Sequence, residues 1–148
     1  MNAPFSKKQL GRFKTLCREK GLKVTPQRIA IYEEICGSDN HPTAEQVYAG
    51  VKRRFSTISL NTVNQTLLTF SQVGLVEVVE GFGSPRRYDP NLKTHHHVHC
   101  VKCGSILDVS NPQYDKLQAP QSIKREYDII TLKVILSGIC SNCRKNNS

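Results

Sequence analysis

Hydrophobic side chains recur at helical spacing in four successive segments within the first 75 residues. Each segment follows a residue whose side-chain oxygen can cap a helix, and three of the segments stop at a glycine. The caps are Ser6, Thr25, Thr43 and Ser59, and the glycines are Gly21, Gly37 and Gly74. The sequence therefore predicts four helices in this half of the chain.

Two short β-strands are expected after the fourth helix. The candidates are Leu75–Val79 and Arg86–Asp89, which Gly81-Phe82-Gly83-Ser84 would join as a hairpin. Helices followed by a two-stranded hairpin are typical of a winged helix-turn-helix domain, in which the helix before the wing enters the major groove of DNA. The expected fold class is therefore α+β.

The polar face of the fourth helix carries side chains suited to DNA. Amides can pair with adenine, and hydroxyls can bind phosphate. The candidates for DNA contact are Ser59, Asn61, Thr62, Asn64 and Gln65 on this helix, Arg53 and Arg54 ahead of it, and Arg86 and Arg87 on the wing. The alternative is a solvated helix face with structural arginines.

The charge of the chain favours a polyanionic partner. The 21 Lys and Arg side chains against 12 Asp and Glu give a formal net charge of +9, which indicates nucleic acid first. No apolar run approaches the roughly 20 residues of a membrane span, and residues 1–6 lack the apolar core of a signal peptide. We expect a cytoplasmic protein with no membrane partner.

Four cysteines in the second half form two C-x-x-C pairs, Cys100 with Cys103 and Cys140 with Cys143. Four thiolates match a structural Zn²⁺ ion, which prefers soft donors in a closed tetrahedral shell. The 36 residues between the pairs leave room for a small domain. Two disulfides or a reduced apolar core are the alternatives, and the reducing cytosol favours zinc over disulfides.

A run of histidines leads directly into the first cysteine pair. In an extended segment His95, His97 and His99 would share one face, while His96 would point to the other. Two histidines at positions i and i+2 can bind one divalent transition metal ion. The alternative is a solvated polyhistidine patch, which the nearby cysteine pair makes less attractive.

Taken together, these features resemble the ferric uptake regulator (Fur) family of metal-responsive bacterial repressors. The resemblance covers nearly the whole chain. Its motifs are Thr25-Pro26-Gln27-Arg28, His41-Pro42-Thr43-Ala44, Ser59-x2-Thr62-Val63, Gly74-Leu75-Val76, Arg87-Tyr88-Asp89, His95-x-His97 and both C-x-x-C pairs. It implies a winged-helix DNA-binding domain in residues 1–90, a hinge near Pro90, and a small α/β dimerisation domain in residues 91–148. The implied partners are a second copy and a palindromic operator in double-stranded DNA.

The resemblance also implies two metal sites. The structural zinc ligands would be Cys100, Cys103, Cys140 and Cys143. The regulatory metal ligands would be His41 from the first domain, Asp89 at the hinge, and His95, His97 and Asp108 from the second domain. Because such a shell closes in one relative orientation of the domains, metal binding would select the shape that binds DNA. By themselves, these carboxylates read as ordinary strand or turn residues.

Within the family, an aspartate at the position of Asp108 is similar to the peroxide-sensing PerR branch. There the regulatory metal is Fe(II) or Mn(II), and peroxide oxidises a ligand histidine, which by motif is His41 or His95. A nitrogen and oxygen shell with an open position suits ferrous chemistry. The implied function is a peroxide-responsive repressor. An iron, manganese or zinc uptake regulator without peroxide sensing is the alternative.

Several positions depart from the family pattern. Asn64 replaces a usual tyrosine, which weakens contact with thymine methyl groups. Residues 132–135 replace a His-x-Leu-Glu stretch, so an additional metal site found in some members is in doubt, and His96 and Asp115 are its remnants. The position of His99 is usually apolar, and we leave this residue outside the metal shell.

The region between the cysteine pairs is unusual too. Residues 111–126, which contain Pro112 and Pro120, have an unusually short helical pattern where the family has a dimer-domain helix. Ile129–Ile139 is expected to form a long strand of the dimer sheet.

Two other classes of function are compatible with these residues. One is a zinc-stapled DNA-binding protein that does not switch, and the other is a metalloenzyme that hydrolyses its substrate at the His/Asp site. The chain lacks an H-E-x-x-H helix, and no general base remains once the carboxylates are ligands. We therefore expect no enzyme activity, and no small-molecule partner beyond metal ions and hydrogen peroxide.

Overall fold

The computed structural model describes residues 5–38, 41–79 and 85–146, and it divides into two compact units, Met1–Leu92 and Lys93–Ser148. The loop predicted at Gly81-Phe82-Gly83-Ser84 lies outside the described residues. Within the part of the chain that is described, no helix has both the length and the apolar character needed to cross a membrane.

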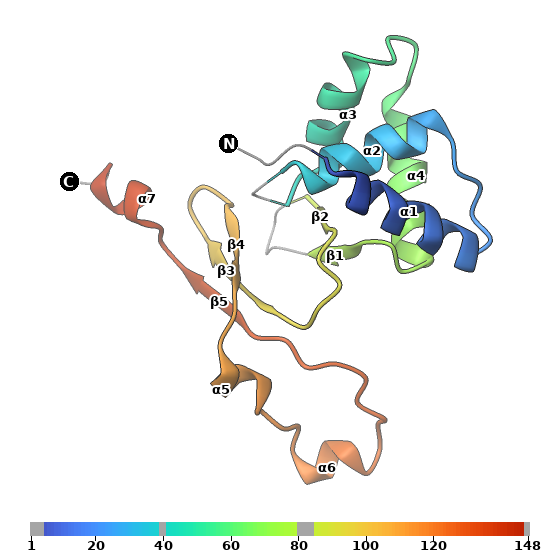
Figure 1. Ribbon diagram of the computed structural model, residues 1–148. Helices are drawn as coiled ribbons and strands as arrows, with labels where there is room; N and C mark the ends of the chain where they lie inside the picture. The colour runs from blue at the N-terminus through green and yellow to red at the C-terminus, as the bar shows by residue number, and fades with distance from the viewer. Residues whose placement is uncertain (1–4, 39–40, 80–84, 147–148) are drawn as a thin grey trace. The chain divides into compact units, whose positions relative to one another are not determined.

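The four predicted helices form the body of the first unit (Figure 1). They are α1 (Lys7–Glu19), α2 (Pro26–Cys36), α3 (Ala44–Lys52) and α4 (Leu60–Gln72). All four predicted caps accept a hydrogen bond from a backbone N–H in the first turn, and Ser6 and Thr43 complete capping boxes. The four helix predictions are confirmed. They could be made from the sequence because each cap lies next to the helix that it begins.

The apolar faces of these helices pack into one core. Its largest fully buried side chains include Phe13, Ile31, Leu67 and Phe70, and the Phe13 and Phe70 rings meet edge to face at 5.7 Å. The chain leaves α4 through Gly74, whose φ of +76° suits a residue without Cβ.

The wing consists of β1 (Glu77–Val79) and β2 (Arg87–Asp89), which pair antiparallel with Val78 opposite Tyr88. Both strands are shorter than predicted, because Leu75 and Val76 are buried in the turn that follows α4 and Arg86 precedes the paired residues. The helices and this hairpin make the winged helix-turn-helix arrangement that the sequence predicts.

The second unit is built on a three-stranded sheet with the order β4-β3-β5 (Figure 1). Its strands are β3 (His96–Cys100), β4 (Ile106–Val109) and β5 (Ile135–Gly138). The central strand β3 runs antiparallel to β4 and parallel to β5. The short helix α7 (Ser141–Lys145) follows β5.

A long segment without buried residues connects β4 to β5 (Figure 1). It holds only the four-residue helices α5 (Pro112–Asp115) and α6 (Gln121–Lys124), in agreement with the short helical pattern of residues 111–126.

The prediction of a long strand at Ile129–Ile139 is wrong, because only Ile135–Gly138 of this range forms a strand, β5. β3 begins at His96, and His97 already lies opposite Ile135, so residues 129–133 run past the end of their partner strand. The fold class is nevertheless α+β, as expected.

Candidate functional site

The four paired cysteines come together in the second unit. Their sulfur atoms all lie within 4.8 Å of one another, and the Cys103 and Cys140 sulfurs are 3.8 Å apart. Sulfur ligands about 2.3 Å from one tetrahedral Zn²⁺ lie about 3.8 Å from each other, so the set fits zinc. All four are free cysteines, which excludes the disulfide alternative for this structure.

Backbone and side-chain groups prepare these sulfurs for a cation. Hydrogen bonds from backbone N–H groups, those of Cys103 and Cys140 first, lower the pKa of the Cys100 thiol to about 6. The pKa of Cys143 is raised to about 12, chiefly because its sulfur shares a hydrogen bond with Cys140. A bound dication would favour the ionised form of all four thiols, because metal ions bind the deprotonated sulfur.

A second set of ligand atoms converges beside β3. The Nε2 atoms of His95 and His97 are 3.0 Å apart, and each lies 3.3 Å from Oδ1 of Asp108. The pairing of β3 with β4 places His97 directly opposite Asp108. Two ligands about 2.1 Å from one ion and at a right angle lie about 3 Å apart, so these three atoms fit one metal shell.

The orientation of His95 leaves a lone pair for a metal. Its Nδ1 lies 2.6 Å from the backbone carbonyl of Lys93 and must donate to it, since a carbonyl oxygen only accepts. In the neutral ring Nε2 then carries the lone pair. The sequence does not indicate this role of Lys93, because every residue type has a backbone carbonyl.

In the first unit, His41 and Asp89 form a pair of ligand groups. His41 Nε2 lies 3.7 Å from Asp89 Oδ2, and both side chains are buried. The other carboxylate oxygen of Asp89 accepts from the Asn91 N–H at 2.8 Å. The ring and the carboxylate therefore present a nitrogen and an oxygen ligand side by side.

His96 has partners other than those of His95 and His97. Its Nδ1 accepts from the Val134 N–H at 3.0 Å, so its Nε2 carries the proton and donates to Asp115 at 2.9 Å. Both ring nitrogens are therefore occupied by protein groups. His99 is buried and lies outside the sets described above.

The residues predicted to contact DNA lie around α4. Asn61, Thr62, Asn64 and Gln65 are all exposed, whereas the hydroxyl of Ser59 is hydrogen-bonded to Thr62 as the helix cap. A hollow of about 300 Å³ is lined by Asn64 and Gln65 from α4 and by Arg86 from the wing, among other residues.

The predicted arginines are placed differently from one another. Arg53 is exposed at the end of α3. The Arg54 guanidinium forms a 2.6 Å ion pair with Glu33, and Arg87 donates to the His41 carbonyl at 3.2 Å. Arg54 and Arg87 thus have intramolecular partners that the sequence pattern did not reveal.

The fold and these sites define a class: a winged-helix protein with a thiolate site and nitrogen- and oxygen-ligand sets that could hold metal ions. The ferric uptake regulator family profile matches residues 19–137, and the chain belongs to this family.

Relatives and solved structures agree with this assignment. The chain is 31% identical over 131 residues to the peroxide-responsive repressor PerR of Staphylococcus epidermidis, covering 88% of this chain and 87% of that protein. The peroxide stress regulator of Campylobacter jejuni has a similar structure, with a TM-score of 0.68 and 27% identity over 90% of this chain and 98% of that one.

The ferric uptake regulator Fur of Helicobacter pylori, described as having three functional metal-binding sites, matches the whole of both chains with a TM-score of 0.79 and 23% identity. This last likeness establishes the fold alone.

Proposed function

We propose that this chain is a metal-dependent, DNA-binding repressor that senses hydrogen peroxide through oxidation of a histidine ligand. The observation that carries the proposal is the convergence of His95 Nε2, His97 Nε2 and Asp108 Oδ1 within 3.3 Å of one another. Such nitrogen and carboxylate donors suit Fe(II) and Mn(II) better than thiolate sites do. The likeness to PerR over most of the chain supports the same function.

We further propose that one regulatory ion uses His41 and Asp89 together with His95, His97 and Asp108. Neither set alone offers enough donors for the octahedral shell that Mn(II) favours, whereas five donors would leave one position open. An ion shared by both sets would hold the two units in one orientation, so that its capture or loss would change DNA binding. The four cysteines would hold structural Zn²⁺.

The DNA-binding role rests on exposed amides and on charge. Asn61, Asn64 and Gln65 are exposed on α4, and Arg86 borders the same hollow as two of them. Amides can read adenine, and the excess of 21 basic over 12 acidic side chains favours phosphate. We propose that α4 binds the major groove of a palindromic operator in the cytoplasm.

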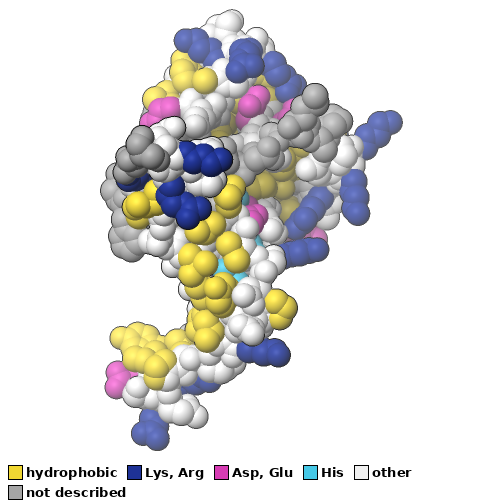
Figure 2. All heavy atoms as spheres, turned by 90° about the vertical axis from the view of Figure 1, so that its left-hand side faces the viewer, with side chains coloured by type: hydrophobic (Ala, Val, Ile, Leu, Met, Phe, Trp, Pro, Cys, Tyr) yellow, Lys and Arg dark blue, Asp and Glu magenta, His cyan; other side chains and the backbone are white. Residues whose placement is uncertain are grey.

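The surface of the second unit supports a homodimer. Leu107, Ile135 and Leu136 of its sheet are 40–52% exposed, and Ile130 is 97% exposed. Figure 2 shows hydrophobic side chains gathered along this unit. Exposed apolar clusters of this kind mark interfaces, and the outer edge of β5 has no strand partner among the described residues.

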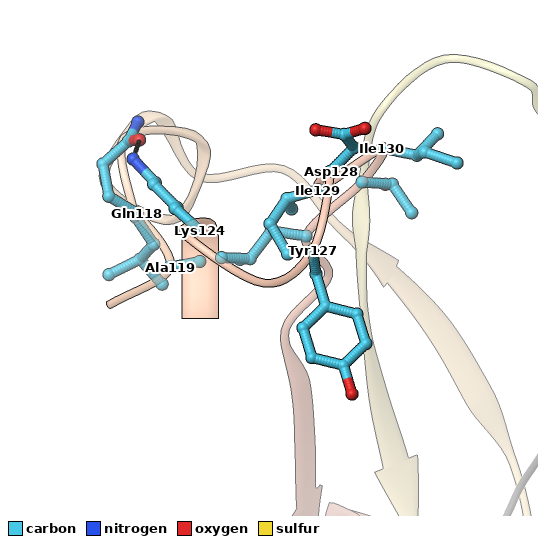
Figure 3. Close-up of a pocket in the computed structure, with 10 residues that line it drawn as sticks. Gln118, Ala119, Lys124, Tyr127, Asp128, Ile129 and Ile130 are labelled. Atoms are coloured by element: carbon cyan, nitrogen blue, oxygen red, sulfur yellow. Dashed lines mark hydrogen bonds between the residues drawn. The ribbon is translucent and has the colours of Figure 1, made fainter. Parts of the chain in front are cut away.

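The segment before β5 adds to this apolar surface. A hollow of about 430 Å³ is lined by residues between Leu117 and Leu132 (Figure 3). At one end Lys124 donates to Gln118 at 2.7 Å, and at the other Ile129 and Ile130 are exposed. We propose that a second copy covers this segment together with the sheet.

The decisive test compares two metals. Duplexes selected from a random DNA library with Mn(II)-loaded protein would serve as the probe, and binding would be measured before and after dilute peroxide. Fe(II) held by the His and Asp ligands would supply the redox chemistry that activates peroxide. Overall, one oxygen atom of the peroxide enters a C–H bond of an imidazole ring and the other leaves as water, so no net electrons are taken from the metal. We expect the Fe(II) form alone to lose DNA, with one added oxygen on the peptide that holds His41 or His95.

Asp108→Glu is the matched control, because it keeps a carboxylate ligand but displaces it by one methylene. We expect this variant to retain metal-dependent DNA binding with blunted peroxide sensitivity. Equal retention of DNA by the Fe(II) and Mn(II) forms of the wild type would instead indicate a metal-uptake regulator. Binding that ignores removal of the labile metal would indicate a DNA-binding protein that does not switch.

The relatives are regulators rather than enzymes, and we propose no catalytic turnover for this chain. Hydrolase activity that survives removal of the cysteine-bound zinc would contradict this.

A further inference from the structure

Strand β2 is fastened to the segment that precedes α3. The Tyr88 N–H donates to the Pro42 carbonyl at 3.1 Å, and Thr43 forms an isolated antiparallel bridge with Arg87. The Arg87 side chain adds a third link, because its Nη1 donates to the His41 carbonyl at 3.2 Å. All three links lie within the first unit.

We infer that Arg87 is a positioning residue for the metal ligand His41, and not a phosphate contact. The inference rests on the proposed function, since it takes His41 as a ligand of the regulatory ion. Arg87 donates to the backbone carbonyl of His41, so it would act on the metal site through the placement of that residue.

His41 has a backbone that needs such support. Its φ is +50°, which no other non-glycine residue shows in the described part of the chain. Side chains with a Cβ atom rarely adopt this left-handed conformation. A hydrogen bond to the carbonyl of this residue opposes rotation of the peptide that follows it, and thereby fixes the direction in which the imidazole leaves the chain.

The alternation of side chains along β2 allows Arg87 and Asp89 both to approach His41. Residues two apart in a strand point to the same side. Arg87 binds the backbone of His41, while Asp89 Oδ2 lies 3.7 Å from its Nε2. One strand therefore binds the main chain of His41 and places a carboxylate beside its ring.

Arg86 provides a natural comparison, because it is the next residue and has a different environment. It is exposed and lines the hollow that also contains Asn64 and Gln65 of α4, whereas Arg87 is half-buried. The two neighbouring arginines therefore have different roles. Arg86 is available to contact DNA, and Arg87 binds the backbone of His41.

The test separates metal affinity from DNA affinity. Mn(II) affinity would be measured on zinc-loaded protein without DNA, by competition with a fluorescent chelator. DNA affinity would then be measured at saturating Mn(II) over a range of salt concentrations. For Arg87→Gln we expect about tenfold or more weaker Mn(II) binding, as for other residues that orient a ligand, and an unchanged salt dependence of DNA binding.

For Arg86→Gln we expect the reverse: unchanged Mn(II) affinity and a salt slope smaller by about 0.9, the loss of one phosphate contact. Arg87→Lys keeps the positive charge without the planar fork, and we expect it to weaken Mn(II) binding as well. In metal-free protein, the Tyr88 amide should exchange its hydrogen faster in Arg87→Gln than in Arg86→Gln. This exchange does not depend on metal or DNA.

The inference would be overturned if Arg87→Gln bound Mn(II) like the wild type and the salt slope of its DNA binding were smaller by about 0.9. Arg87 would then be a phosphate contact. His41→Ala separates this failure from failure of the proposed function. If His41→Ala loses Mn(II) and Arg87→Gln does not, only the role of Arg87 is wrong. If His41→Ala binds Mn(II) like the wild type, the proposed ligand set is wrong and the inference falls with it.

Discussion

At the scale of single residues, His96 shows how hydrogen bonding decides what an imidazole can do. A histidine ligates a metal through an unprotonated nitrogen. In His96 one nitrogen accepts from Val134 and the other donates to Asp115, and the ring also meets Tyr114 edge to face at 5.4 Å. His96 therefore ties β3 to α5 and to the residue before β5 without any ion.

We therefore expect Asp115→Ala to lower the free energy of unfolding and to leave metal binding unchanged. The change leaves the buried Nε2–H of His96 without its acceptor, which costs about 1 kcal/mol of the free energy of unfolding, the low end of the range because Asp115 is 53% exposed and water can partly replace it. Urea unfolding of zinc-loaded protein would measure this loss. Asp115→Asn keeps an acceptor and should lose less.

The number of bound metal ions per chain is the second readout for these two variants. It should be the same in Asp115→Ala, Asp115→Asn and the wild type. A lower number in Asp115→Ala would mean that His96 and Asp115 hold an ion after all.

At the scale of elements, Ser59 precedes α4 and lies where two roles, capping the helix and contacting DNA, can be tested separately. The Ser59 Oγ accepts from the Thr62 N–H at 3.1 Å and so caps α4. Removing such a cap typically costs about 1 kcal/mol, whereas aspartate caps as well as serine does. Ser59→Ala should therefore lower the free energy of unfolding by about 1 kcal/mol, and Ser59→Asp should not, which thermal unfolding can compare.

The same pair of variants tests the position of Ser59 against DNA. If Ser59 faces a phosphate, the added negative charge of Ser59→Asp should weaken DNA binding even though α4 is intact. Unchanged DNA binding by Ser59→Asp would show that this residue is only a cap.

Local signals explain why the helices were predictable and parts of the second unit were not. Thr43 caps α3 through contacts to residues three positions away, so the sequence holds all the information needed. The start of β5 at Ile135 depends on where β3 begins, at His96, which lies 39 positions earlier in the chain. The hydrophobic pattern near Ile135 cannot show this.

The candidate sites divide in the same way. The residue type and spacing of the cysteine pairs indicate a zinc site, and the structure brings their sulfurs together. The bonds of Arg54 to Glu33 and of Arg87 to the His41 carbonyl join residues 21 and 46 positions apart, so nothing in the local pattern distinguishes these arginines from phosphate contacts.

At the scale of the molecule, the two units are stabilised differently. The first has a continuous core of aromatic and aliphatic side chains. In the second, Cys100 and Ile106 are the buried hydrophobic residues among those described. Most of the large exposed hydrophobic side chains of the described residues also lie in this unit. A unit of this size with so little core needs a metal or a partner for stability.

Loss of the cysteine-bound zinc should therefore dismantle the second unit and spare the first. Cys140→Ser removes one thiolate from the set and the sulfur that accepts from the Cys143 N–H. Because zinc binding supplies folding free energy, we expect this variant to lose zinc, to lose the sheet of the second unit and to sediment as a monomer. The helices α1–α4 do not depend on these sulfurs, so most of the helical circular dichroism should persist. Cys36→Ser, at a cysteine outside the cluster, is the matched control and should keep both zinc and the dimer. A stable zinc-free dimer of Cys140→Ser would show that the apolar surface alone holds the second unit together.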